Sequence, residues 1–254
     1  MKRLSRATAA SMLGLALVMS PMTDVQAAEL KILAGGSMTG SLNELGPQFE
    51  RASGHKLTIH FDSTPNLIKQ VTSGAPFDLV VTPVDVFKDA AAKARFGPSP
   101  TIDIARVGYG VAVRAGAPKP DISTPDALKK TLLDAQSIAF VPASAAGACV
   151  LKMFERLDIG EPMKAKTRPQ AAPAQIGPAV AKGEAELAVF LTSVLIAPGV
   201  DLVGSFPAEL QQELVFTAAI AADTKEAEPA KAFIDYLTTP AATAVIKAAG
   251  MNPG

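Results

Sequence analysis

The chain has 254 residues, and its 24 basic and 24 acidic side chains leave it with no formal net charge. This balance gives no basic excess for binding nucleic acid, and the length is enough to bury a full core in one large domain or two smaller ones. With one cysteine and two histidines, the composition excludes an internal disulfide and disfavours a thiolate or imidazole metal site.

Residues 1–27 predict a cleavable secretion signal. Basic residues within segment 2–6 precede an apolar stretch, 7–19, and small residues follow. A membrane-spanning helix needs about 20 apolar residues, and a proline and an aspartate interrupt this run before that length. We expect cleavage after Ala27, or otherwise after Ala28, and export to the periplasm. Cleavage after Ala27 leaves 21 basic and 23 acidic side chains, a net charge of −2.

The first third of the mature chain alternates strands and helices. Apolar runs predict the strands, and helical spacing of apolar residues between capping residues and glycines predicts the helices. In chain order these elements are a strand at 30–34, a helix through 42–52 with a kink at Pro47, a strand at 56–61, a helix at 66–72, a strand at 77–81 and a helix at 85–95. Such alternation is typical of a parallel sheet with helices on its faces.

A longer β-like run at 107–113 continues into a proline-rich segment, 116–125, and we interpret it as the strand that crosses to a second lobe. The alternation then starts again. The predicted elements are a helix at 125–133, a strand at 137–141, a loop at 143–147, helices at 148–157 and 176–182, a strand at 186–191, a β-rich return at 200–221, and closing helices at 229–237 and 240–249.

Two alternating blocks joined by a crossing segment predict an α/β fold with two lobes around a cleft. In each lobe we expect a mostly parallel sheet flanked by helices. The predicted division assigns residues 28–110 and 221–254 to the first lobe and residues 111–220 to the second.

Four loops bring small, hydroxyl-bearing or glycine residues to the start of a predicted helix, namely Gly35–Thr39, Asp62–Pro65, Ala143–Gly147 and Pro173–Ile176. Helix N-termini carry unpaired N–H groups and partial positive charge, and in α/β sheets ligands lie at this edge. In any single loop, capping of the helix is the commoner role of serine and threonine. Several such loops together predict a small anionic ligand held mainly by neutral donors.

Motifs of catalysis are mostly missing from the sequence. Ser37 lacks the following glycine of a nucleophile elbow, and neither a phosphate loop nor a dinucleotide fingerprint occurs. His55 and His60 point to opposite faces of a predicted strand, so they cannot share a metal. Cys149 follows a loop of small residues and has the pattern of a packed core residue. We therefore predict no metal and no cofactor.

Asp62 and Lys69 are the ionisable groups nearest the predicted cleft. Either is a candidate for proton transfer in an enzyme. The alternative for Lys69 is a solvated side chain on its helix, which is the usual state of a surface lysine.

Three segments resemble the periplasmic molybdate-binding protein family. Residues 33–39 are similar to its A-A-A-S-L-T loop, residues 61–70 to its F-x-S-S-x-x-L-x-x-Q-I segment, and residues 73–81 to its x-G-A-P-A-D-[LV]-[FV]-I strand. The similarity extends over nearly all of residues 29–250. It implies a type II solute-binding fold and delivery of a small anion to the membrane permease of an ABC-type transporter. We expect the protein to be a monomer.

The resemblance also implies a set of contacts to the anion. They fall on Ser37, on Thr64, on the region of Ala146 and on the backbone near Ile176, while the family's tyrosine hydroxyl falls near Leu191. The chain has no tyrosine there, and a lost donor costs about 1–3 kcal/mol in a buried site. With the four loops, these contacts give the predicted ligand-binding residues Ser37, Met38, Thr39, Ser63, Thr64, Ala145, Ala146, Gly147, Ile176 and Leu191.

Segments 112–123 and 182–187 are similar to segments of periplasmic aconitate isomerases, enzymes with the same solute-binding fold. This resemblance implies an organic polycarboxylate as ligand and an allylic proton shift without a metal. Such a reaction needs one positioned base, for which Asp62 and Lys69 are the candidates. Two hypotheses therefore remain, a binding protein for an oxyanion or organic carboxylate, and an aconitate isomerase.

Overall fold

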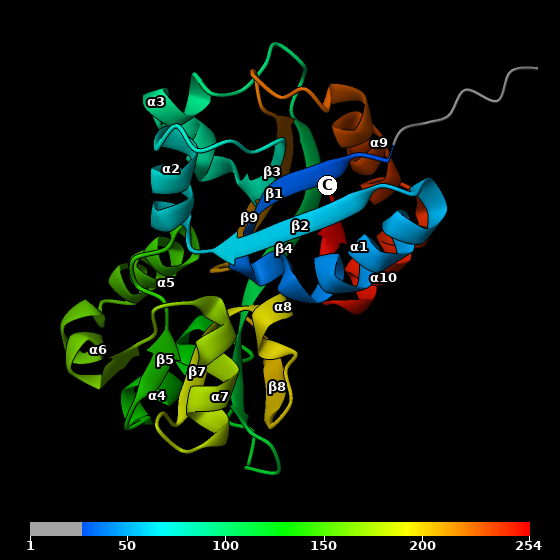
Figure 1. The fold of residues 1–254 in the computed structure, drawn as a ribbon. Coiled ribbons are helices and arrows are strands. Elements are labelled where there is room, and N and C mark those ends of the chain that lie inside the picture. The colour runs from blue at the N-terminus through cyan, green and yellow to red at the C-terminus, as the bar shows by residue number, and fades with distance from the viewer. Residues whose placement is uncertain (1–26) are drawn as a thin grey trace, which may run out of the picture.

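The computed structural model describes residues 27–254 (Figure 1), so the predicted signal lies outside the described residues except for its last residue. Ala28 already belongs to the fold. Its N–H donates to His55 Nδ1 at 3.1 Å, and its carbonyl accepts from Lys56 N at 2.8 Å. Cleavage after Ala27 keeps these bonds, whereas cleavage after Ala28 removes them. No helix among the described residues is both long and apolar enough to cross a membrane.

The first lobe is built on a mixed sheet. β1 pairs in parallel with β2 and β3, and β9 pairs antiparallel with β3. The strands are β1 Glu29–Gly35, β2 Lys56–Asp62, β3 Leu79–Pro83 and β9 Glu213–Ile220. One side of the sheet is covered by α1 Thr39–Ser53, α9 Ala227–Leu237 and α10 Pro240–Ala248, and the other by α2 Thr64–Thr72 and α3 Ala90–Lys93 (Figure 1).

The second lobe has its own mixed sheet. β5 pairs in parallel with β6 and β7, and these strands are β5 Ile138–Phe140, β6 Thr167–Pro169 and β7 Leu187–Leu191. Its helices are α4 Pro125–Asp134, α5 Ala145–Arg156, α6 Gly160–Lys166, α7 Ile176–Ala181 and α8 Thr192–Leu195. β8 Val200–Ser205 closes the remaining edge.

β4, which spans Ile102–Arg114, belongs to both sheets. Its first part, 102–108, pairs antiparallel with β9, and its second part pairs antiparallel with β7 and β8. The short β10 Asn252–Pro253 pairs with the first part. Since β9 starts at Glu213 and lies beside β3, the chain has returned to the first lobe before that residue, earlier than the predicted return at 221. The predicted lobe boundaries otherwise stay a prediction.

The predicted strands and helices occur in the predicted order, with one helix divided and short elements inserted between them. The helix expected at 85–95 is a 3-10 turn, η2 Val84–Lys88, followed by α3. Asp89 separates them because its backbone is extended and its carboxylate accepts from Ala92 N at 2.8 Å. Its capping preference therefore outweighs the helical periodicity around it.

A second difference lies at the start of α5. The loop expected at 143–147 is mostly the first helical turn, because Ser144 caps the helix with its hydroxyl oxygen, which accepts from Gly147 N at 2.9 Å. The short elements α6, β6 and α8 were not predicted. In contrast, α1 continues through Pro47 as expected from its apolar spacing.

Candidate functional site

A small cavity lies where the two lobes meet. Its free space is about 20 Å³, on the order of the space that one water molecule occupies. It is lined by Gly35, Gly36, Ser37, Asp62, Ser63, Thr64, Pro83, Ser144, Ala146, Pro173, Phe190, Leu214 and Phe216. Three of the four predicted loops each contribute two or three residues to it, and the fourth contributes Pro173.

The loop after β1 forms one wall. Ser37 lies in a 3-10 turn, η1 Gly36–Met38, which precedes α1, and it is buried. Its hydroxyl donates to no acceptor within residues 27–254, whereas its carbonyl accepts from Ser193 Oγ at 3.4 Å across the cleft. A side chain on Gly36 would come within 3.2 Å of Pro173, so the glycine permits close contact between the lobes.

The N-terminus of α2 forms the next wall. Ser63 occupies the capping position, but its side chain makes no capping bond. Thr64 Oγ1 accepts from Ala145 N at 3.3 Å, which ties α2 of the first lobe to α5 of the second. As an acceptor in this bond, the Thr64 hydroxyl keeps its proton for another partner. Both side chains are buried.

The first turn of α5 faces these hydroxyl groups from the second lobe. The Ser144 hydroxyl is fully used, since it donates to Val141 O at 2.8 Å and accepts from Gly147 N. The N–H of Ala146 lies in the first turn of the helix, where no intrahelical acceptor exists. α5 therefore contributes a backbone donor to the cavity and not a hydroxyl group.

The remaining wall is apolar and was missed by the sequence prediction. Phe190, Leu214 and Phe216 line it, and all three are buried. Phe190 is the next to last residue of β7, and the other two lie on β9. No sequence motif pointed to them, because they meet the cavity only through the pairing of β4 with both β7 and β9.

Several predicted ligand-binding residues do not line the cavity. Met38 and Ile176 are fully buried core residues. The Thr39 hydroxyl donates to Gly36 O at 2.7 Å. Leu191 is also buried, and it is Phe190 beside it that faces the cavity. Contact of the predicted residues with a ligand, Ala145 and Gly147 included, stays a prediction.

Asp62 lines the cavity as an ionised carboxylate with both oxygens bonded. Oδ1 accepts from Ser63 N at 2.7 Å and Asn66 Nδ2 at 2.8 Å, and Oδ2 accepts from Gln70 Nε2 at 3.0 Å. Burial by itself raises the pKa of Asp62, but these bonds from Asn66 and Ser63, with the ring of His60, hold it below its ordinary value of 3.8. Asp62 is therefore a weak base.

Lys69, the other candidate for proton transfer, lies exposed on α2 and does not line the cavity. Cys149 is half-buried on α5, near the buried hydroxyl of Tyr109. Burial, followed by the Cys149 thiol and Asp85, raises the pKa of Tyr109. Within residues 27–254, no group of three histidine, cysteine or carboxylate side chains is arranged to hold a metal ion.

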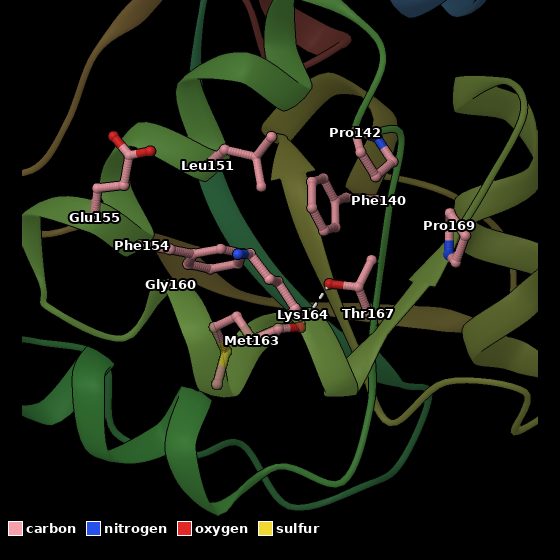
Figure 2. Close-up of a pocket in the computed structure, with 10 residues that line it drawn as sticks. All are labelled: Phe140, Pro142, Leu151, Phe154, Glu155, Gly160, Met163, Lys164, Thr167 and Pro169. Carbon is pink, nitrogen blue, oxygen red and sulfur yellow. Dashed lines mark hydrogen bonds between the residues drawn. The ribbon is translucent and has the colours of Figure 1, made fainter.

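Two other depressions lie in the second lobe. The first, of about 520 Å³, has mostly apolar walls between α5 and α6 (Figure 2). Two of its polar side chains are engaged, since Lys164 pairs with Glu161 and the Thr167 hydroxyl donates to Met163 O at 2.8 Å. No predicted site residue lines it.

The second depression is lined by both segments that resemble aconitate isomerases, through residues such as Arg114 and Glu186. None of its residues lines the interlobe cavity. The similarity in these two segments therefore lies outside the interlobe cavity.

Two α/β lobes share one strand, and hydroxyl groups and helix N-termini converge between them. These features define a two-lobed solute-binding protein. The chain belongs to the bacterial extracellular solute-binding protein family, whose model matches residues 30–252. It is 33% identical to an aconitate isomerase of a Pseudomonas species over 232 residues, 88% of this chain and 87% of that enzyme.

A molybdate-binding protein of Azotobacter vinelandii is 30% identical over 231 residues, 89% of this chain and 90% of that protein. The solved structure of a periplasmic molybdate-binding protein of the same species matches with a TM-score of 0.75 at 22% identity, covering 89% of this chain and 99% of that chain. At this identity the structural match shows the fold.

Gly147→Ala tests whether α5 must pack directly against the end of β5. A Cβ atom at Gly147 would lie 1.9 Å from Val141 O, so we expect the variant to lose at least about 1–3 kcal/mol of unfolding free energy, measured by urea denaturation. Gly40→Ala is the matched helical control, with no atom within 4 Å of the added carbon. An equal effect in both variants would contradict the packing argument.

Asp62→Asn tests the ionisation of Asp62. Because the folded-state pKa is lowered, its contribution to stability is present above the ordinary pKa of 3.8 and lost as pH falls through the folded-state value. We therefore expect the advantage of the wild-type protein over the variant in unfolding free energy to shrink between pH 7 and about pH 3. A difference that stays constant or grows over this window would show that Asp62 has no lowered pKa.

Proposed function

We propose that this protein binds a small anion between its lobes in the periplasm and delivers it to the permease of an ABC-type transporter. The proposal rests above all on one observation, that Ser37, Ser63 and Thr64 and the first turn of α5 line one cavity at the lobe junction. The names of the molybdate-binding relatives and the extracellular character of the family support this proposal.

Ligand binding and lobe closure use the same residues in this proposal. Thr64 contacts Ala145, and Ser37 contacts Ser193, across the cleft. An anion between these walls adds hydrogen bonds that exist only when the lobes are closed. Since a ligand stabilises the state that it binds better, the anion favours the closed form, which is the form that a permease can distinguish from the empty protein.

The lobes in this proposal divide within β4, near Gly108 and Tyr109, and again between β8 and β9. Strand pairing supports the first position, since β9 pairs with β4 up to Gly108 and β7 pairs with it from Tyr109. We also propose that the protein acts as a monomer, because the two lobes of a single chain form the cavity without a second copy.

A ligand panel tests the function. Pure protein is heated with molybdate, tungstate, sulfate, citrate, both aconitate isomers, propionate and crotonate, and we expect at least one of them to raise the melting temperature. Ser37→Ala removes a hydroxyl donor to a charged ligand, so the affinity for that anion should fall about 10- to 100-fold. Ser123→Ala, at an exposed serine, is the control. A panel without any shift would refute the proposal.

Aconitate isomerisation is a second candidate function, favoured by the 33% identity to an aconitate isomerase. The geometry gives it little support, because Asp62 is a weak base and Lys69 lies outside the cavity. If the reaction occurs, incubation of the protein with trans-aconitate should yield the cis isomer, which chromatography detects. A yield no greater than in buffer alone would eliminate this candidate.

A further inference from the structure

We propose that the ligand of the interlobe cavity is a singly charged organic carboxylate with a short apolar body, and not a doubly charged tetrahedral oxyanion or a tricarboxylate. This inference rests on the proposed function and specifies its ligand. Three features of the cavity carry it, namely the number of its free donors, its apolar lining residues and its charge.

The donors that line the cavity are neutral. They are the hydroxyl groups of Ser37, Ser63 and Thr64 and the N–H of Ala146. The Ser144 hydroxyl adds nothing, because Val141 O already takes its proton. A carboxylate has two oxygens with about four lone-pair positions. The free donors therefore match one carboxylate group.

Three of the side chains that line the cavity, Phe190, Leu214 and Phe216, offer no hydrogen bond, and the faces of aromatic rings carry partial negative charge. A tetrahedral oxyanion has oxygens on all sides, so at least one would face this wall without a donor, at a cost of about tenfold or more in affinity. The carbon atoms of a short organic acid gain from the same contact.

The charge of the cavity acts against a dianion. Asp62 contributes a carboxylate, and among residues 27–254 no lysine or arginine lines the cavity. Since the Coulomb energy is proportional to each charge, a dianion is repelled twice as strongly as a monoanion at the same distance. A tricarboxylate is repelled more strongly still.

Isothermal titration calorimetry of the full secreted protein tests this choice. The probes are propionate and crotonate as monoanions, molybdate and sulfate as dianions, and trans-aconitate as a trianion. We expect propionate or crotonate to bind at least about tenfold more tightly than either dianion. Tighter binding of molybdate, sulfate or trans-aconitate would overturn the inference and leave the proposed function standing. Absence of binding by every probe would overturn both.

Two variants and one control keep the test specific to the apolar residues and the charge. Phe190→Tyr adds a hydroxyl donor to the apolar wall. The ratio of the affinity for monocarboxylates to that for dianions should therefore fall. Phe96→Tyr makes the same change at a half-buried ring outside the cavity and should leave the preference unchanged. Asp62→Asn should improve dianion binding more than monoanion binding. Equal effects of Phe190→Tyr and Phe96→Tyr, or of Asp62→Asn on both ligand classes, would overturn the inference.

Discussion

The junction of the two lobes depends on one set of hydrogen bonds. In it, the Gln211 side chain bonds the backbone N–H and carbonyl of Tyr109. Tyr109 lies where β4 leaves the first sheet and enters the second. Its N–H donates to Gln211 Oε1 at 2.8 Å, and its carbonyl accepts from Gln211 Nε2 at 2.9 Å and from Phe206 N at 2.9 Å. A buried backbone group without a partner is costly. The Gln211 side chain bonds these backbone groups in place of a neighbouring strand, and β4 can continue from the first sheet into the second. The segment that carries Gln211 is also the second crossing between the lobes.

Most of the fold follows from local patterns in the sequence. Apolar periodicity with capping residues predicts α4, which Thr124 caps, and α10, which Thr239 caps. The misses have local physical reasons. Asp89 divides a predicted helix by capping its second part, and Ser144 starts α5 earlier than expected. The early return through β9 could not be predicted, because it depends on pairing between strands far apart in the chain.

The polar half of the site was predictable and the apolar half was not. Ser37, Ser63, Thr64 and Ala146 lie at helix starts, where local sequence indicates an anion site. Phe190 and Phe216 have the pattern of ordinary strand residues, and only the tertiary pairing brings them to the cavity. The prediction at Leu191 differs from Phe190 by one position. Because neighbouring strand residues face opposite sides, that single step separates a core residue from a cavity residue.

Asp62 connects the structure of the cleft with its selectivity. Its carboxylate holds Ser63 and Asn66 at the start of α2, which fixes the position of the Thr64 hydroxyl that spans the lobes. A neutral residue there would hold the turn with fewer hydrogen bonds. In the proposed complex the same charge lies beside the anion, so the arrangement that positions the donors also weakens binding as the ligand's charge grows. A protein built this way gains an ordered cleft at the expense of affinity for highly charged anions, and the apolar wall recovers affinity for ligands with a carbon body.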